Sequence, residues 1–183
     1  MITVNEKMAL LAQVISMKAD LGKTAVMKIM YILQKVYKLP LDYSFSIYTY
    51  GPYCSDVMAD IDTASAENII SIKTNYYTNG KIGYDISTSE NSSKVIKDSS
   101  DFLNKYKDEI AEVLYCFGDK TAKELELYST VIYIYNSYIE NQWEFTIRDI
   151  SENVHEIKPH FSIAEIENAY NDLKDRAILD KIA

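Results

Sequence analysis

Ile69-Ile-Ser-Ile-Lys-Thr-Asn-Tyr-Tyr77-Thr-Asn79-Gly80-Lys81-Ile-Gly-Tyr-Asp-Ile86 is the clearest local signal in the chain. Its two ends, residues 69–77 and 81–86, have the composition that is typical of strands. Asn79-Gly80 lies between them, and this dipeptide supplies the positive φ angles that a tight type I′ turn requires. The stretch therefore predicts a two-stranded β-hairpin.

The residues before this hairpin predict two helices, a short strand and a third helix. Thr3 and Glu6 form a capping box that begins the first helix, and an apolar stripe over residues 23–38 marks the second. Residues 43–50 alternate at period two and predict a strand, and a helix follows from about Ser55. Helix, helix, strand, helix and hairpin is the element order of a winged helix-turn-helix domain.

The second half of the chain predicts a second unit of the same kind. Residues 87–101 contain six serines and are interpreted as a solvated connector. Further capping boxes, Thr121 with Glu124 and Ser162 with Glu165, begin later helices, and residues 177–179 lead into a second small wing.

The predicted fold class is mainly α with small β wings, arranged as tandem winged helix-turn-helix-like units. Residues 1–90 form the N-terminal winged-helix-like domain, and residues 91–183 form the C-terminal helical, helix-turn-helix-like domain. One irregular helical domain with a hairpin is the alternative.

Composition predicts a cytoplasmic protein. Of the 183 residues, 48% are apolar and 25% are charged, which is the usual balance of a globular chain. No apolar run is long enough to span a membrane, and the first residues do not have the pattern of a secretory signal. Two cysteines, Cys54 and Cys116, are too few for a disulfide framework and suit a reducing compartment.

The charge distribution disfavours nucleic acid as a partner. The net charge is −8, and the two candidate recognition helices, within residues 53–68 and 162–176, are rich in acids. Acidic helices repel the phosphates that a DNA-reading helix must approach. The alternative function is a winged-helix DNA-binding transcriptional regulator that uses another face, with Lys28 and Lys35 on the second helix and the lysines of the wing.

The sequence contains no recognisable catalytic, cofactor-binding or metal-binding pattern. Gly22-Lys23-Thr24 resembles the end of a phosphate-binding loop, but the motif also requires a glycine where Met17 stands. The two histidines and two cysteines match no common ligand spacing, and no base can be assigned to a nucleophile. We therefore predict a protein that is not an enzyme and that uses no cofactor or metal.

Several residues resemble a known family. The chain resembles the YwgA-like proteins of bacteria, which are of largely unknown function. The resemblance lies in Lys28, Tyr31 and Gln34 on the second helix, in the step Gly51-Pro52 and in the segment 125–130. The resemblance extends more distantly to the Panacea (SocA-like) antitoxin domain, and it covers mainly residues 1–90. The more distant resemblance, to the Panacea domain, implies a small cytoplasmic protein that neutralises a partner toxin by direct contact, without a cofactor.

The function predicted from these observations is a regulatory, antitoxin-like interaction protein that contacts another protein; a homodimer is also compatible with the sequence. The candidate partner-binding residues are Tyr48, Tyr50, Tyr53, Lys28 and Lys35. The alternating strand directs the first two tyrosines away from the core, and tyrosines are frequent in binding surfaces. The alternative is that these tyrosines pack beneath the first two helices.

Overall fold

A computed structural model describes residues 2–78, 80 and 82–182. The protein is mainly helical, with two small antiparallel sheets of two strands each. The helices are α1 (Val4–Met17), α2 (Lys23–Lys35), α3 (Ser55–Ala66), α4 (Ser92–Asp98), α5 (Ser100–Lys105), α6 (Lys107–Phe117), α7 (Ala122–Glu140), α8 (Ile147–Ile157), α9 (Ile163–Asp175) and the 3-10 helix η1 (Leu179–Lys181). The strands are β1 (Ser46–Tyr48), β2 (Gly51–Tyr53), β3 (Ile70–Tyr76) and β4 (Ile82–Thr88). None of the described helices is both long and apolar enough to cross a membrane.

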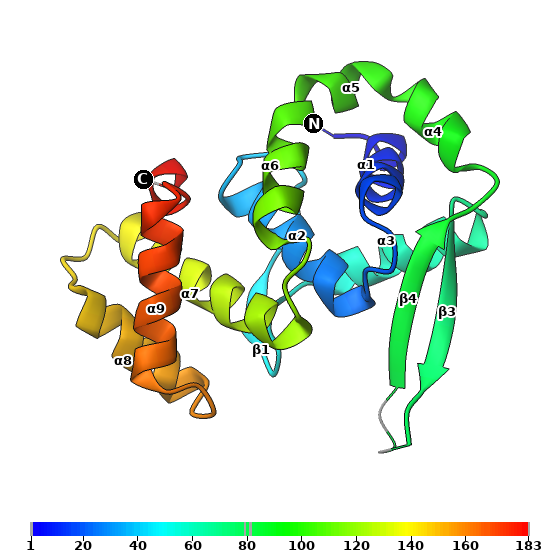
Figure 1. The fold of residues 1–183 in the computed structure, drawn as a ribbon. Coiled ribbons are helices and arrows are strands. Elements are labelled where there is room, and N and C mark those ends of the chain that lie inside the picture. The colour runs from blue at the N-terminus through cyan, green and yellow to red at the C-terminus, as the bar shows by residue number, and fades with distance from the viewer. Residues whose placement is uncertain (1, 79, 81, 183) are drawn as a thin grey trace.

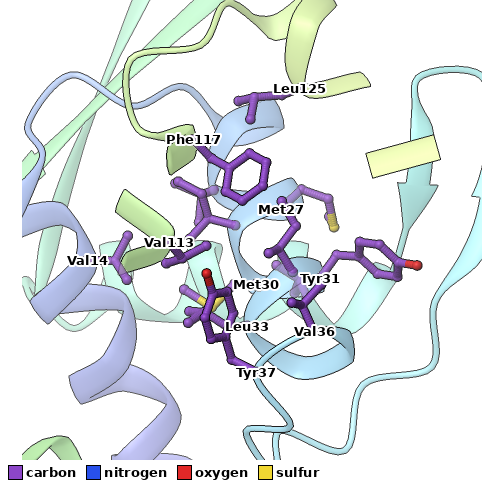
Figure 2. Close-up of a cluster of buried hydrophobic side chains, with 14 of the residues drawn as sticks. Val14, Met27, Met30, Tyr31, Leu33, Val36, Tyr37, Val113, Phe117 and Leu125 are labelled. Carbon is purple, nitrogen blue, oxygen red and sulfur yellow. The ribbon is translucent and has the colours of Figure 1, made fainter. Parts of the chain in front are cut away.

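Helix α2 lies at the centre of the molecule, and its residues from Val26 to Leu33 are all buried. Figure 2 shows side chains of α2 packed with Phe117 of α6 and Leu125 of α7. An apolar stripe this wide is buried on several sides because helices and the small sheets surround it. The elements that approach α2 therefore determine which surfaces remain open for function.

The serine-rich residues 87–101 are not a solvated connector, so that prediction is wrong. They contain the end of β4, the helix α4 and the start of α5, and Figure 1 shows α4, α5 and α6 arching over α1. Ser92 is buried, donates a hydrogen bond to the Ile69 carbonyl and accepts one from the Ser89 amide. Ser92 therefore satisfies backbone groups at a chain reversal, a role that composition alone does not distinguish from solvation.

Buried residues of both halves of the chain belong to one hydrophobic cluster. The division into units 1–90 and 91–183 stays a prediction. In the second half, α7 packs against both α8 and α9, on the side of the molecule opposite the β3–β4 hairpin (Figure 1). The second wing predicted after Ala177 is wrong, because Leu179–Lys181 is the 3-10 helix η1.

The predicted hairpin is confirmed as β3 and β4, which pair in an uninterrupted antiparallel register. Asn79 and Lys81 of the predicted turn lie outside the described residues. The hairpin projects from the helical body (Figure 1), and the loop between α1 and α2 contacts it where Leu21 pairs with Ile86.

The strand predicted over residues 43–50 is shorter in the structure. Only Ser46–Tyr48 is a strand, and it pairs with Gly51–Tyr53 to form the β1–β2 hairpin. The chain reverses at Thr49 and Tyr50, and the next residue, Gly51, has a φ of 86°, which lies in the left-handed region that favours glycine. The β1–β2 hairpin contains all three tyrosines that the sequence nominates for binding.

Candidate functional site: a tyrosine-lined cleft

A cleft of about 930 Å³ lies between the β1–β2 hairpin, the start of α2 and the β3–β4 hairpin. We call it the tyrosine cleft, because five tyrosines are among its lining residues: Tyr48, Tyr50, Tyr53, Tyr77 and Tyr84. Its volume is in the range of small-molecule and peptide sites, and Met58 and Ile82 add further apolar surface.

The predicted exposure of the hairpin tyrosines is confirmed. Tyr48 and Tyr50 are each 66% exposed and Tyr53 is 38% exposed, so the alternative that they pack beneath the first two helices is wrong. The rings of Tyr48 and Tyr53 lie with their centroids 5.7 Å apart and form a small aromatic platform. Their role in binding a partner stays a prediction.

The prediction that Lys28 belongs to an exposed basic face of α2 is wrong. Its side chain is only 2% exposed, because the β1–β2 hairpin lies over the first half of α2. Lys35, two turns later, remains partly exposed and forms an ion pair with Glu140 at 3.2 Å. Lys28 and Lys35 share a helical face, as their spacing predicts, but only part of that face meets solvent.

Two buried lysines donate hydrogen bonds to backbone carbonyls of the β1–β2 hairpin from its interior side. The ammonium group of Lys28 donates a hydrogen bond of 2.6 Å to the carbonyl oxygen of Pro52. That of Lys158, which follows α8 and is 3% exposed, donates to the carbonyl oxygens of Tyr48, at 2.8 Å, and of Thr49. Both ends of the hairpin turn are therefore fixed by charge-assisted hydrogen bonds in a buried environment.

The buried carboxylate of Glu126 balances part of this positive charge. The Glu126 Oε1 atom lies 3.3 Å from the Lys158 ammonium and 3.4 Å from His160 Nε2. Burial lowers the pKa of Lys28 to about 8, although the charge of Glu126 opposes that shift. The cause is desolvation, which disfavours the charged form of a lysine.

Gly51 allows the hairpin turn to approach α7 closely. A Cβ atom at this position would lie 3.1 Å from the Thr130 hydroxyl oxygen and 3.2 Å from that of Ser129. The absent side chain and the positive φ angle both favour glycine here. The turn is therefore packed against α7 as well as bonded to the two lysines.

Sequence reasoning missed Lys158 and Glu126, and it did not join Tyr77 and Tyr84 of the β3–β4 hairpin to the other tyrosines. Glu126 lies within the segment 125–130 that carries the family resemblance, and that was the one signal for it. Lys158 is 110 residues from Tyr48, so no local pattern connects the two.

Charged groups of both signs line the tyrosine cleft, and among the described residues they are Lys18, Lys23, Lys28, Lys120, Asp20, Asp85 and Asp119. Lys18 pairs with Asp119, and Lys23 pairs with Asp62 at 2.9 Å. The ammonium of Lys120 lies over the ring of Tyr128, 3.9 Å from its centroid. The cleft therefore offers aromatic and apolar surface rather than a strong field of one sign.

The residues around the cleft do not form a recognisable catalytic set. Neither histidine and neither cysteine is among the described residues that line it. Across the described ranges, no group of three or more His, Cys, Asp or Glu side chains is placed to hold a metal ion.

The sequence matches no protein-family model and no curated protein. The resemblance to YwgA-like proteins and to the Panacea domain therefore stays a prediction.

Proposed function

We propose that this protein is a non-enzymatic regulatory protein that acts by binding another protein through the tyrosine cleft. One observation carries the proposal: Tyr48 and Tyr50, each 66% exposed, stand on a hairpin whose backbone is fixed from beneath by buried Lys158. Solvent-exposed aromatic side chains on a fixed backbone are a favourable arrangement for binding.

The physical reason is that such a surface loses little conformational freedom when a partner binds. A tyrosine offers a large contact area at the cost of only two side-chain torsions, and aromatic residues are enriched among those that dominate interface energies. The hydrogen bonds from Lys28 and Lys158 order the hairpin backbone before any partner arrives. Preorganisation of this kind increases affinity by lowering the entropy lost on association.

The order α1, α2, β1–β2, α3, β3–β4 supports the interpretation of the first half as a winged helix-turn-helix unit, and the α8–α9 pair supports a second unit.

DNA binding remains the less favoured alternative. Helix α3, the expected recognition helix, contains no basic residue, and its Asp60 accepts a hydrogen bond from Tyr43 while its Asp62 pairs with Lys23. A gel-shift titration near physiological salt is expected to give weak, salt-sensitive binding, and nanomolar sequence-selective binding would favour the alternative.

The resemblance to YwgA-like and Panacea proteins supports an antitoxin-like role in the cytoplasm, in which the bound protein is a toxin that is neutralised by contact. Such a role needs no cofactor and no catalytic group. A protein surface that is preformed and largely neutral is consistent with it.

The test compares two tyrosine variants of the full chain as baits for proteins in an extract of the cells that produce it. Tyr48→Ala/Tyr50→Ala removes the exposed rings of the cleft. Tyr115→Ala removes a ring that is 85% exposed on α6 and does not line the cleft. We expect the double variant to lose a partner that the wild type and the Tyr115 variant retain.

All three proteins must show the same circular dichroism and the same unfolding midpoint for the comparison to hold. Retention of every captured protein by a folded Tyr48→Ala/Tyr50→Ala variant contradicts the proposal. Equal loss from both variants also contradicts it, because the effect would not be specific to the cleft.

A further inference from the structure

The outer edge of β4 forms one wall of the tyrosine cleft. At Ile86 this edge is already occupied: the Ile86 amide donates to the Leu21 carbonyl at 3.1 Å, and the Asp20 amide donates to the Ile86 carbonyl at 3.2 Å. Both main-chain groups of Ile86 therefore point away from β3. Residues of an antiparallel ladder alternate between groups that face the neighbouring strand and groups that face outward.

The same alternation fixes the direction of the groups at Tyr84 and Ile82. They are two and four residues before Ile86 in an uninterrupted register, opposite Thr74 and Tyr76. Their amide and carbonyl groups therefore also face outward, toward the side on which the cleft lies. Gly83 and Asp85, between them, supply the hydrogen bonds to β3.

The loop between α1 and α2 occupies this edge for only a short distance. It reaches Gly22, where an added Cβ atom would lie 3.0 Å from the Tyr84 carbonyl oxygen, and the chain then turns into α2. Among the described residues, no hydrogen bond is made to the amide of Tyr84 or to either main-chain group of Ile82. The α1–α2 loop thus covers this edge only around the single bridge of Leu21 with Ile86, and beyond it the edge has no neighbouring strand among the described residues.

The open edge also lacks two of the features that usually protect strand edges. The described part of β4 contains no proline and no bulge, and its outward-facing residues are Ile82, 54% exposed, and Tyr84, 36% exposed. Natural edge strands are commonly blocked by charges, prolines or bulges, because unpaired backbone groups can pair with another chain.

We propose that the partner supplies an extended polypeptide segment, which adds to the edge of β4 at Tyr84 and Ile82 inside the tyrosine cleft. This inference rests on the proposed function and names the form of the partner. Main-chain hydrogen bonds to the edge supply directional affinity, and alternate side chains of the segment contact the tyrosines. Two edge residues spaced by roughly 7 Å accommodate a segment of about four residues.

The charges of the site indicate that this segment is uncharged and apolar. The described lining holds lysines and aspartates in nearly equal number, and Lys18 and Lys23 are paired with acids, so the wall has little net charge to attract a charged segment. A charged side chain would lose water there without gaining a counter-ion. A second copy of this chain is a poorer occupant, because each copy carries a net charge of −8 and the two would repel one another.

The experiment uses a displayed library of linear twelve-residue peptides as the probe and the full-length protein as the target. Amide hydrogen exchange of the protein is followed residue by residue by NMR. In the free protein we expect fast exchange at Ile82 and Tyr84 and slow exchange at Gly83 and Asp85. A selected apolar peptide is expected to slow exchange at Ile82 and Tyr84 about tenfold or more.

Two variants at one position then separate the backbone from the side chain. Ile82→Pro removes the outward amide without removing a bond to β3, because proline is tolerated at such edge positions. Ile82→Ala removes the side chain and keeps the amide. We expect the proline variant to bind the selected peptide about tenfold more weakly than the alanine variant.

Peptides that bind without slowing exchange at Ile82 and Tyr84, or that bind both variants equally, overturn the inference. So does slowed exchange that depends on protein concentration alone, which would identify a second copy as the occupant. The wild-type exchange data decide the question if Ile82→Pro does not fold. A partner that is lost from Tyr48→Ala/Tyr50→Ala but retained by a folded Ile82→Pro leaves the proposed function standing and overturns only the added strand.

Discussion

The Lys28 ammonium group donates a hydrogen bond of 2.6 Å to the carbonyl oxygen of Pro52, at a position where the lysine is only 2% exposed. This bond joins the central helix to the turn that presents Tyr48 and Tyr50. A protonated amine in such surroundings has lost most of its water, and the carbonyl and the charge of Glu126 replace that water only in part. The protonation state of one buried side chain is therefore linked to the stability of the binding hairpin.

The first prediction is that stability increases with pH near and above neutrality. Burial lowers the pKa of Lys28 to about 8 in the folded protein, against 10.5 for an ordinary lysine. Between these values the unfolded chain binds more protons than the folded one, so the free energy of unfolding rises with pH. From pH 7 to pH 9.5 we expect Lys28 to add about 2 kcal/mol.

The measurement is urea unfolding at several pH values for the wild type and for Lys28→Met. The methionine variant cannot titrate at this position, so the difference between the two proteins isolates the lysine. A difference that is constant over this pH range would show that Lys28 keeps an ordinary pKa in the folded state.

The second prediction concerns the pair formed by Lys158 and Glu126, which are 3% and 6% exposed. Lys158→Met leaves the Glu126 carboxylate buried without its cation and the carbonyls of Tyr48 and Thr49 without their donor. We expect it to lower the free energy of unfolding by about 3 kcal/mol.

A double-mutant cycle with Glu126→Leu provides the control. Each single variant leaves one buried charged group without its partner. The loss of unfolding free energy in the double variant should therefore be smaller than the sum of the two single losses, by about 1 kcal/mol or more. Strictly additive effects would mean that the two side chains do not interact in the folded protein.

Local signals predicted the helix starts well. The capping boxes at Thr3, Thr121 and Ser162 are all present in the structure, because each depends on only four consecutive residues. A further box at Thr146 was missed, since its third position is Asp149 rather than the usual Glu or Gln. The Asn-Gly hairpin was predicted for the same local reason.

Contacts between distant segments were not predictable from these patterns. The spacing of Lys28 and Lys35 shows that they share a helical face, but not that the β1–β2 hairpin covers Lys28. The hydrogen bond from Lys158 to the Tyr48 carbonyl spans 110 residues, and a lysine before a proline suggests no such role. Exposure of Tyr48 and Tyr50 was predicted because strand alternation is local, whereas the joining of two hairpins around one cleft depends on the tertiary fold.

The third prediction is that Gly51→Ala destabilises the hairpin turn. A methyl group at this position would meet the hydroxyl groups of Thr130 and Ser129 at 3.1 and 3.2 Å, and the φ of 86° is unfavourable for alanine. We expect the free energy of unfolding to fall by roughly 2 kcal/mol. Gly80→Ala is the matched control: Gly80 also has a positive φ, of 77°, but among the described residues no atom is found within 4 Å of the added group.

The two glycine variants separate crowding from backbone strain. Thermal or urea unfolding should show the larger loss for Gly51→Ala. Equal losses would mean that the turn can move away from α7 without cost, which would also weaken the claim that the tyrosines are held in place.

The last prediction is that Tyr31→Phe stabilises the protein. Tyr31 of α2 is fully buried (Figure 2), and no described residue offers its hydroxyl oxygen a hydrogen-bond partner. Removing an unsatisfied buried hydroxyl should raise the free energy of unfolding by about 1 kcal/mol, because its desolvation is no longer uncompensated. Tyr43→Phe is the opposite case, since the Tyr43 hydroxyl donates to Asp60 at 2.6 Å, and it should destabilise. Urea unfolding of both variants makes the comparison, provided that the m-values are unchanged. If Tyr31→Phe destabilises the protein as much as Tyr43→Phe does, the Tyr31 hydroxyl is hydrogen-bonded in solution.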